Sequence, residues 1–262
     1  LPSVSFNAIS DDNVLNAVEK GQDLSVSGTS ANLAEGTVVT VTLNGKNYTA
    51  TTGSDGTWSL TVPAADLAGL GQASYTLNAT ATNGVGNSVS SSANLLVDTA
   101  LPTVTINTVA GDNVINAAEV ASGQTLSGTV ANAEAGNTVT VTIGGHSYTA
   151  TVQNNLSWSV NVPSDVLTAL SNGSLSVTAT VTNGHGNTGT GEREIAIDAN
   201  LPGLRVNTVA GDDVVNTIEH AQNLIVSGSS DGLAPGTALT VTVNGKDYAA
   251  TVLADGTWRA AI

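Results

Sequence analysis

The chain has 262 residues, of which 40% are hydrophobic and only 3% aromatic, and its formal net charge is −15 because acidic residues far outnumber lysines and arginines. This charge argues against nucleic acid or an anionic membrane surface as a partner. The absence of cysteine excludes disulfides as a source of rigidity, and nothing in the sequence resembles a signal peptide or a membrane-spanning helix.

The sequence repeats itself every 100 residues without a gap, as the tryptophans at 58, 158 and 258 illustrate. A period of this length indicates that each repeat is a whole domain, not one turn of a solenoid. We therefore predict domains at residues 1–100, 101–200 and 201–262. The third repeat ends before the helical turn and the last two strands that its siblings have, so we expect the sequence to be a segment of a longer protein.

The second repeat illustrates the elements expected in each domain. Apolar and polar residues alternate in short runs separated by turn residues, which is typical of a small antiparallel sandwich. Seven strands are predicted, at 103–109, 124–130, 138–143, 146–152, 157–162, 174–182 and 190–197, with a helical turn at 163–170. Between the third and fourth strands, Gly144-Gly145 is replaced in the other repeats by Asn-Gly, a strong signal for a tight hairpin. The predicted fold class is all-β, with tandem immunoglobulin-like seven-stranded antiparallel β-sandwiches arranged end to end.

Each repeat carries one tryptophan, in the strand that follows the hairpin. We favour a packing role, because aromatic side chains contribute the largest buried area in cores of this kind. The alternative is a stacking platform for sugars, for which the lack of neighbouring aromatic residues is unfavourable.

The segment between the first and second strands is rich in oxygen-bearing side chains. In all three repeats an Asn stands three residues before a Glu, a spacing that predicts a capping box at the start of a helical turn. Capping does not explain the acidic or amide pair that precedes this Asn. Carboxylate, amide and carbonyl oxygens suit calcium, which takes six to eight oxygen ligands, whereas solvated surface acids are the plainer alternative.

Topology suggests where further ligands would come from. In an immunoglobulin-like sandwich this segment lies at the end where the chain leaves the domain, next to the linker and to the loops of the following repeat. We predict that the first junction gathers ligands for Ca²⁺ from Asp12, Asn13, Glu19, Asp98, Asn183 and Asn187. The second junction would use Asp112, Asn113, Glu119 and Asp198, and the equivalent positions of the third repeat are Asp212, Asp213 and Glu219.

Three sequence features resemble one known family. They are the segment Gly-Asp-Asn-Val-Ile-Asn-Ala-Ala-Glu that begins at Gly111, the linker from Asp98 to Pro102, and the loops Asn83–Asn87 and Asn183–Asn187. They resemble the bacterial immunoglobulin-like repeats of giant adhesins exported by type I secretion, including the Bap-like biofilm proteins. The resemblance covers both complete repeats and most of the third, and it implies a cell-surface stalk whose junctions are stiffened by calcium. The two loops open with Asn where many relatives have Asp, so fewer charges suggest weaker binding.

The leading functional hypothesis is a structural stalk segment of a secreted or surface-bound bacterial adhesin, active in cell adhesion or biofilm formation. Its expected partners are neighbouring repeats of the same chain and, through a distal region, a receptor on a host cell or in the biofilm matrix. The chain itself is expected to be a monomer without enzymatic activity, because its three histidines fall at unrelated positions of the repeat and no nucleophile or phosphate-binding motif is present. A glycan-binding module and accessory domains of a secreted hydrolase are the alternatives.

Overall fold

The structure, a computed structural model, describes residues 1–262. Strands dominate, and no helix is long and apolar enough to cross a membrane. The chain forms two compact units. The first contains Leu1–Val109, Gln124–Val162 and Leu175–Ile195, and the second contains Ala110–Gly123, Pro163–Ser174 and Ala196–Ile262. This division runs through the second repeat, and the domain boundaries after residues 100 and 200 stay a prediction.

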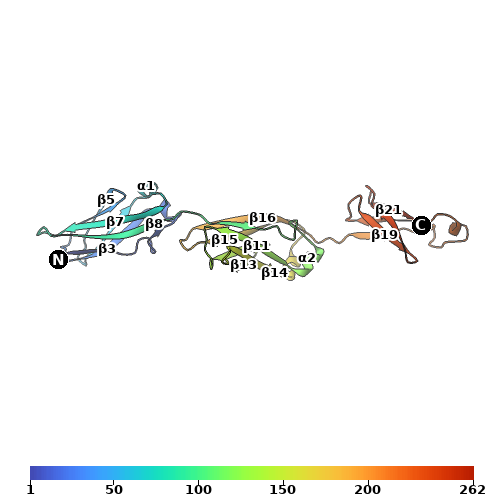
Figure 1. Ribbon diagram of the computed structural model, residues 1–262, viewed down its shortest axis with the longest axis horizontal. Coiled ribbons are helices and arrows are strands. Elements are labelled where there is room, and N and C mark those ends of the chain that lie inside the picture. The colour runs from blue at the N-terminus through green and yellow to red at the C-terminus, as the bar shows by residue number, and fades with distance from the viewer. The chain divides into compact units, whose positions relative to one another are not determined.

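The first repeat is a sandwich of two sheets (Figure 1). The smaller sheet has the order β1-β3-β6 and the larger one β2-β8-β7-β4-β5. The strands of this repeat are β1 (Ser3–Phe6), β2 (Val14–Leu15), β3 (Leu24–Ala31), β4 (Val38–Leu43), β5 (Lys46–Thr51), β6 (Thr57–Val62), β7 (Ala73–Thr82) and β8 (Ser88–Val97), with short helical turns η1 (Glu19–Gly21) and α1 (Ala64–Leu67). Buried and exposed residues alternate along β6, as expected when one face of a strand covers a core.

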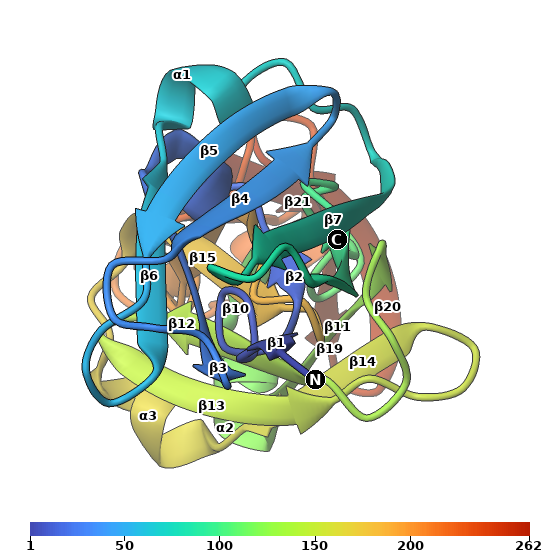
Figure 2. The same ribbon diagram turned by 90° about the vertical axis from the view of Figure 1, so that its left-hand side faces the viewer.

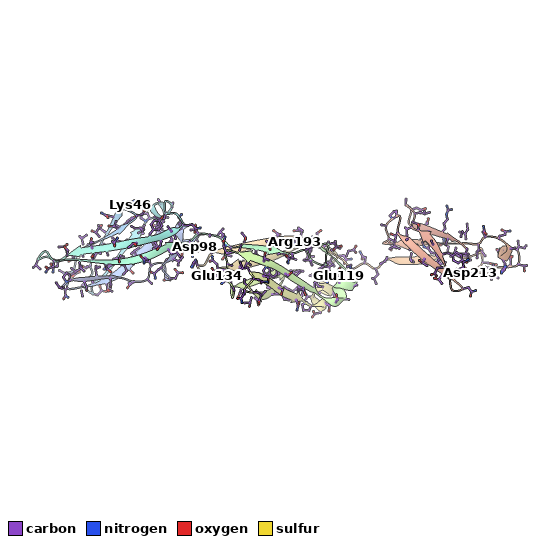
Figure 3. The ribbon with its side chains drawn as sticks, in the orientation of Figure 1. Lys46, Asp98, Glu119, Glu134, Arg193 and Asp213 are labelled. Carbon is purple, nitrogen blue, oxygen red and sulfur yellow. The ribbon has the colours of Figure 1, made fainter.

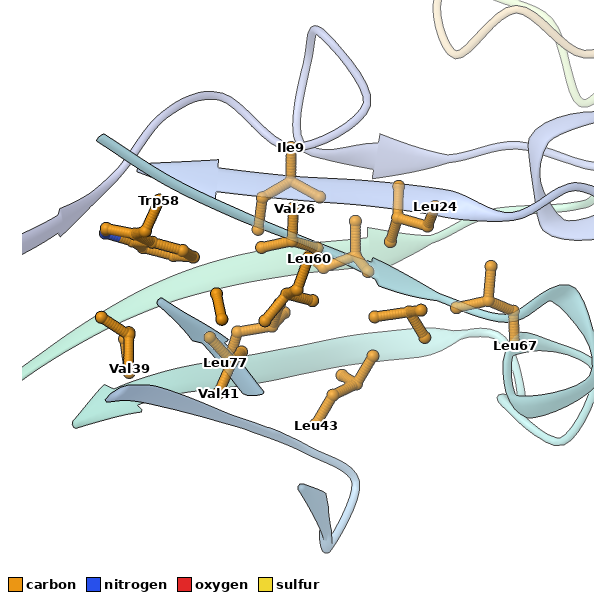
Figure 4. Close-up of a cluster of buried hydrophobic side chains, with 14 of the residues drawn as sticks. Ile9, Leu24, Val26, Val39, Val41, Leu43, Trp58, Leu60, Leu67 and Leu77 are labelled. Atoms are coloured by element: carbon orange, nitrogen blue, oxygen red, sulfur yellow. The ribbon is translucent and has the colours of Figure 1, made fainter. Parts of the chain in front are cut away.

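The core of the first repeat lies between its two sheets (Figure 4). It consists mostly of Val, Leu and Ala, and the Trp58 ring meets Phe6 edge to face with 5.4 Å between the ring centroids. The exposed fractions of Trp58, Trp158 and Trp258 are only 2%, 1% and 4%. The packing role of the tryptophans is therefore confirmed, and none of the three rings presents a stacking face to a sugar.

The second repeat uses the same sheet orders, β9-β11-β14 and β10-β16-β15-β12-β13. Its elements are β9 (Thr103–Ile106), β10 (Val114–Asn116), α2 (Ala117–Ser122), β11 (Gln124–Ala131), β12 (Thr138–Ile143), β13 (His146–Thr151), β14 (Ser157–Val162), α3 (Ser164–Ala169), β15 (Gly173–Thr182) and β16 (Thr188–Asp198). The seven predicted strands are present, and β10 is an additional strand that runs parallel to β16. Sequence reasoning missed β10 because three residues are too few to display a period-two pattern.

The third repeat has its own two sheets, β17-β18-β21 and β19-β20. Its elements are β17 (Gly203–Val206), η2 (Glu219–Ala221), β18 (Ile225–Asp231), β19 (Ala238–Val243), β20 (Lys246–Thr251) and β21 (Thr257–Ala261). Only Val226, Ala250, Trp258 and Ala260 form its buried cluster. This core is smaller than that of the first repeat.

The tight hairpin turns are confirmed. Figure 2 shows the β4–β5 hairpin, in which Asn44 and Gly45 have φ values of 46° and 78°. Gly144 and Gly145 have φ values of 55° and 81°. Two successive residues with positive φ define the turn whose twist matches that of the flanking strands, which explains why only Asn and Gly occur there.

Candidate functional site: the junction between the first and second repeats

The end face of the first repeat is built by the parallel pairing of β2 with β8. The Leu96 amide donates to the Asn13 carbonyl at 2.9 Å, and the Asp98 amide donates to the Leu15 carbonyl at 3.2 Å. This pairing brings the segment after β2 alongside the linker after β8. The expected proximity of these two segments is therefore confirmed.

Asn16 and Glu19 form the predicted capping box. The Asn16 Oδ1 accepts hydrogen bonds from the amides of Val18 and Glu19, each at 3.0 Å, and the Glu19 Oε2 accepts one from the Asn16 amide at 2.9 Å. Asn116 and Glu119 make the same set of bonds at the start of α2. Each capping box satisfies backbone donors that the first turn of a helix leaves free, so capping accounts for both side chains.

Asp12 and Asn13 hold the shape of their own loop. The Asp12 Oδ1 accepts from the Val14 amide at 2.8 Å, and the Asn13 Oδ1 accepts from the Ile9 amide at 3.0 Å. Asn13 has a φ of 65°, a conformation that Asn tolerates better than most residues. Asp112, Asp212 and Asp213 bond to loop amides in the same way. Hydrogen bonds to loop amides thus give a structural role to the acidic and amide pairs that precede each capping Asn, which capping itself did not explain.

The second repeat contributes the loop Asn183–Asn187, which connects β15 to β16. The Asn183 Oδ1 accepts from the amides of His185 and Asn187 at 3.1 and 3.0 Å. The Asn183 amide donates to the Asn187 carbonyl at 2.9 Å, and the Asn183 Nδ2 donates to the Asn132 carbonyl at 3.2 Å. One side chain therefore organises the loop and ties it to the body of the repeat.

This loop contacts the end face of the first repeat through three bonds. The Asn187 Oδ1 accepts from the Ala17 amide at 2.9 Å, and the Asn187 Nδ2 donates to the Asp98 carbonyl at 2.8 Å. The His185 Nδ1 lies 2.6 Å from the Asp98 Oδ2. Asn187 is only 1% exposed. Figure 3 labels Asp98, which thus contacts the second repeat through both its carbonyl and its carboxylate.

The Asp98–His185 contact changes the electrostatics of the junction. The hydrogen bond from His185 holds the pKa of the Asp98 carboxyl below its usual range, and the backbone amide of Ala100 lowers it further. An acid whose pKa is lowered is stabilised in its charged form. Sequence reasoning did not identify His185 as a junction residue. The available signal was that, of the loops Asn83–Asn87 and Asn183–Asn187, only the second has an imidazole at its centre.

The arrangement can be compared with the predicted calcium site. Of the six predicted ligands, Asp98 and Asn187 bond across the contact. Asn183 bonds within the second repeat, and Asp12, Asn13 and Glu19 bond within their own segment. No group of three or more His, Asp or Glu side chains is arranged to hold a metal ion. Calcium takes six to eight oxygen ligands, which can include amide and backbone carbonyl oxygens, so calcium ligation at this contact stays a prediction.

The predicted second site has a similar local geometry. The Asp112 and Glu119 carboxylates bond to amides of their own segment, and the Asp198 Oδ1 accepts from the Asn200 amide at 3.3 Å. In the third repeat the Glu219 Oε2 bonds to the Asn216 amide at 3.0 Å. Calcium ligation by these residues and by those of the first junction stays a prediction.

Comparison with known proteins places this geometry in a family. Residues 7–99 match the model of the bacterial Ig-like domain, and no curated protein matches the chain. A solved structure of a 1.5-MDa bacterial ice-binding adhesin, studied for its retention at the host cell surface, is 32% identical with a TM-score of 0.51 over 100% of this chain and 86% of that chain. A Ca²⁺-stabilized adhesin that helps an Antarctic bacterium bind ice is 35% identical with a TM-score of 0.53 over 99% of this chain and 65% of that chain. The chain is therefore a member of the bacterial Ig-like domain family and is similar to tandem repeats of bacterial adhesins.

Proposed function

We propose that this chain is a structural stalk segment of a large bacterial surface adhesin, in which tandem Ig-like repeats act as spacers. The observation that carries the proposal is the contact made by Asn187, whose side-chain amide bonds to the first repeat both as an acceptor and as a donor. Hydrogen bonds at two atoms of one planar group restrict rotation more than a single bond does. A spacer benefits from such a restriction because it must hold its ends apart.

The composition supports the same role. The repeats are acidic overall and contain no cysteine, so neighbouring stalks repel one another and rigidity has to come from packing and from contacts between repeats. The similarity to bacterial adhesins supports a location outside the cell or at its surface. Adhesion to a receptor would then belong to another region of the protein, and participation in biofilms and export by type I secretion are further parts of this proposal.

The proposal further includes stiffening of the junctions by calcium, which requires a separate test. The second of the two similar adhesins is described as Ca²⁺-stabilized. In the present chain an ion at the first junction would have to compete with His185 for the Asp98 carboxylate. Calcium therefore stabilises the first junction only if ion binding rearranges this contact.

The stalk proposal is tested by measuring the width of the distance distribution between the first and second repeats. The native chain has no cysteine, so Thr49→Cys and Thr149→Cys introduce two unique labelling sites on exposed positions of β5 and β13. Pulsed electron resonance between spin labels at these sites should give a narrow distance distribution. A distribution as broad as that of a flexible linker would contradict the stalk role.

The same labelled chain tests calcium. Measurements with a few millimolar calcium and with excess chelator should differ if the ion stiffens the junction, and magnesium should not replace calcium. If the distribution is equally narrow in chelator, the direct contacts of Asn187 and His185 suffice, and calcium has no role at this junction.

A further inference from the structure

The first repeat contains a second copy of the junction loop, and this copy has no partner in the structure. Asn83–Asn87 connects β7 to β8, as Asn183–Asn187 connects β15 to β16. Asn187 is buried by the first repeat, whereas Asn87 is exposed and its side-chain amide makes no hydrogen bond. Val85, at the position of His185, is 82% exposed.

The unpartnered loop nevertheless has the conformation of the docked one. The Asn83 amide donates to the Asn87 carbonyl at 2.9 Å, and the Asn83 Oδ1 accepts from the Asn87 amide at 2.9 Å. The corresponding distances in the docked loop are 2.9 and 3.0 Å. The loop is therefore organised by its own Asn before any contact is made, which reduces the entropy that docking costs.

Gly186 and Gly86 occupy the same position in the docked and the unpartnered loop, and they differ in how close the neighbouring atoms are. A Cβ atom on Gly186 would lie 3.0 Å from the Asn16 Nδ2, whereas a Cβ on Gly86 would have nothing within 4 Å. Gly186 has a φ of 79° and Gly86 a φ of 87°. The backbone of the first-repeat loop is thus shaped for the same close approach, and the space in front of it is open.

Both the first and the second repeat have an end face of the kind that the docked loop contacts. In the first repeat it consists of the Ala17 amide and the Asp98 carbonyl and carboxylate. In the second repeat the equivalent segments are held together by the pairing of β10 with β16, with Asn116 opposite Asp198. The Asn116 side chain caps α2 as Asn16 caps its own turn.

We propose that the loop Asn83–Asn87 is a docking surface for the end face of another Ig-like unit of this kind, and that Asn87 is the residue that recognises it. The Asn87 Oδ1 accepts from the backbone amide at the position of Ala17, and its Nδ2 donates to the carbonyl at the position of Asp98. This inference rests on the proposed stalk function and identifies the partner of one of its surfaces.

The residue in the middle of the loop sets the strength of this docking. The His185 imidazole supplies a partner for the carboxylate of Asp98, but the side chain of Val85 has no polar atom and cannot form a hydrogen bond with a carboxylate. A contact made by the first-repeat loop therefore lacks one of the three bonds of the observed junction, and it is weaker. Junctions in an array of these repeats thus differ in strength according to one loop residue.

The test uses an extended chain in which a copy of residues 101–200 precedes Leu1 of the full chain. Spin labels are placed at Thr149→Cys of the added copy and at Thr49→Cys of the first repeat. A narrow distance distribution is expected. Asn87→Ala should broaden it, since the loss of two hydrogen bonds lowers the ratio of docked to undocked forms by roughly 5- to 150-fold. The matched control is Asn187→Ala in the original second repeat, which removes the same group from the other loop. It should leave the distance between the added copy and the first repeat unchanged.

A second variant, designed to strengthen the contact, distinguishes a specific loss of docking in Asn87→Ala from general damage to the fold. Val85→His supplies an imidazole for the Asp198 carboxylate of the added copy and should narrow the distribution further. The proposal is overturned if the added junction is broad from the outset, or if it is narrow and indifferent to both Asn87→Ala and Val85→His. Either result leaves the stalk function standing, provided that the native junction, measured between residues 49 and 149, remains narrow.

Discussion

Gly28 lies where β3 passes between β1 and the Trp58 indole, and its replacement tests how the tryptophan is packed. A Cβ atom at this position would lie 1.9 Å from the Ser5 carbonyl oxygen and 2.3 Å from the Trp58 Cζ2. Both separations are far below van der Waals contact, and one of the obstructing atoms belongs to the backbone. Gly28→Ala therefore cannot be accommodated by a side-chain rotation alone, and β1 has to move away from β3.

The cost of that movement follows from what β1 contributes. Val4 is buried, and exposing a buried valine costs about 1.5–3 kcal/mol. Each backbone hydrogen bond lost from the β1–β3 pairing adds about 1 kcal/mol. With two such bonds lost, the free energy of unfolding of the first repeat falls by about 3.5–5 kcal/mol. For a domain of this size, that loss lowers the Tm by at least roughly 14 °C.

Differential scanning calorimetry of the full chain measures this change, because only the transition of the first repeat should move. Gly21→Ala is the matched control, since a Cβ on Gly21 would meet nothing within 4 Å, and its effect should stay within about 1 kcal/mol. If Gly28→Ala unfolds at the same temperature as Gly21→Ala, the argument from close packing is refuted.

Three further predictions follow from local contacts. Asn116→Ala removes the side chain that caps α2, so the second repeat should lose about 1 kcal/mol of stability in calorimetry, and an unchanged midpoint would contradict the capping role. Burial of the phenol and its hydrogen bond to Asp66 raise the pKa of Tyr48 from 10.0 to about 12. The stability linked to this group is therefore complete below pH 10 and is lost as the pH rises through 12, and Asp66→Asn should lower the pKa in an ultraviolet absorbance titration, whereas an unchanged titration would refute the contribution of the carboxylate. Gly144→Asn keeps a positive φ that Asn tolerates and restricts the unfolded chain, so thermal unfolding should show a midpoint equal to or above that of the native chain, and a clear decrease would contradict the assigned turn type.

Local patterns in the sequence were enough to predict the strands and turns of each repeat. Strand boundaries at Thr138–Ile143 and Ser157–Val162 coincide with those of the structure, because alternation of β-branched and small polar residues reflects a half-buried strand directly. The hairpin turns and the capping boxes were equally accessible, since each depends on residues within a few positions of one another. The packing of the tryptophans was predictable because aromatic side chains contribute the largest buried area in such cores.

The hydrogen bonds of the oxygen-bearing side chains became visible only in the folded chain. The sequence predicts Asp12 and Asn13 as calcium ligands. The structure adds that one side-chain oxygen of each accepts from a loop amide, an arrangement that depends on backbone torsions such as the φ of 65° at Asn13. The junction depends on residues far apart in the chain, with Ala17 bonded to Asn187. Such a contact leaves no periodic trace in either segment, because it involves one backbone amide and one side chain. Only the fold, by running β2 beside β8, brought the linker and the loop of the next repeat to the same place.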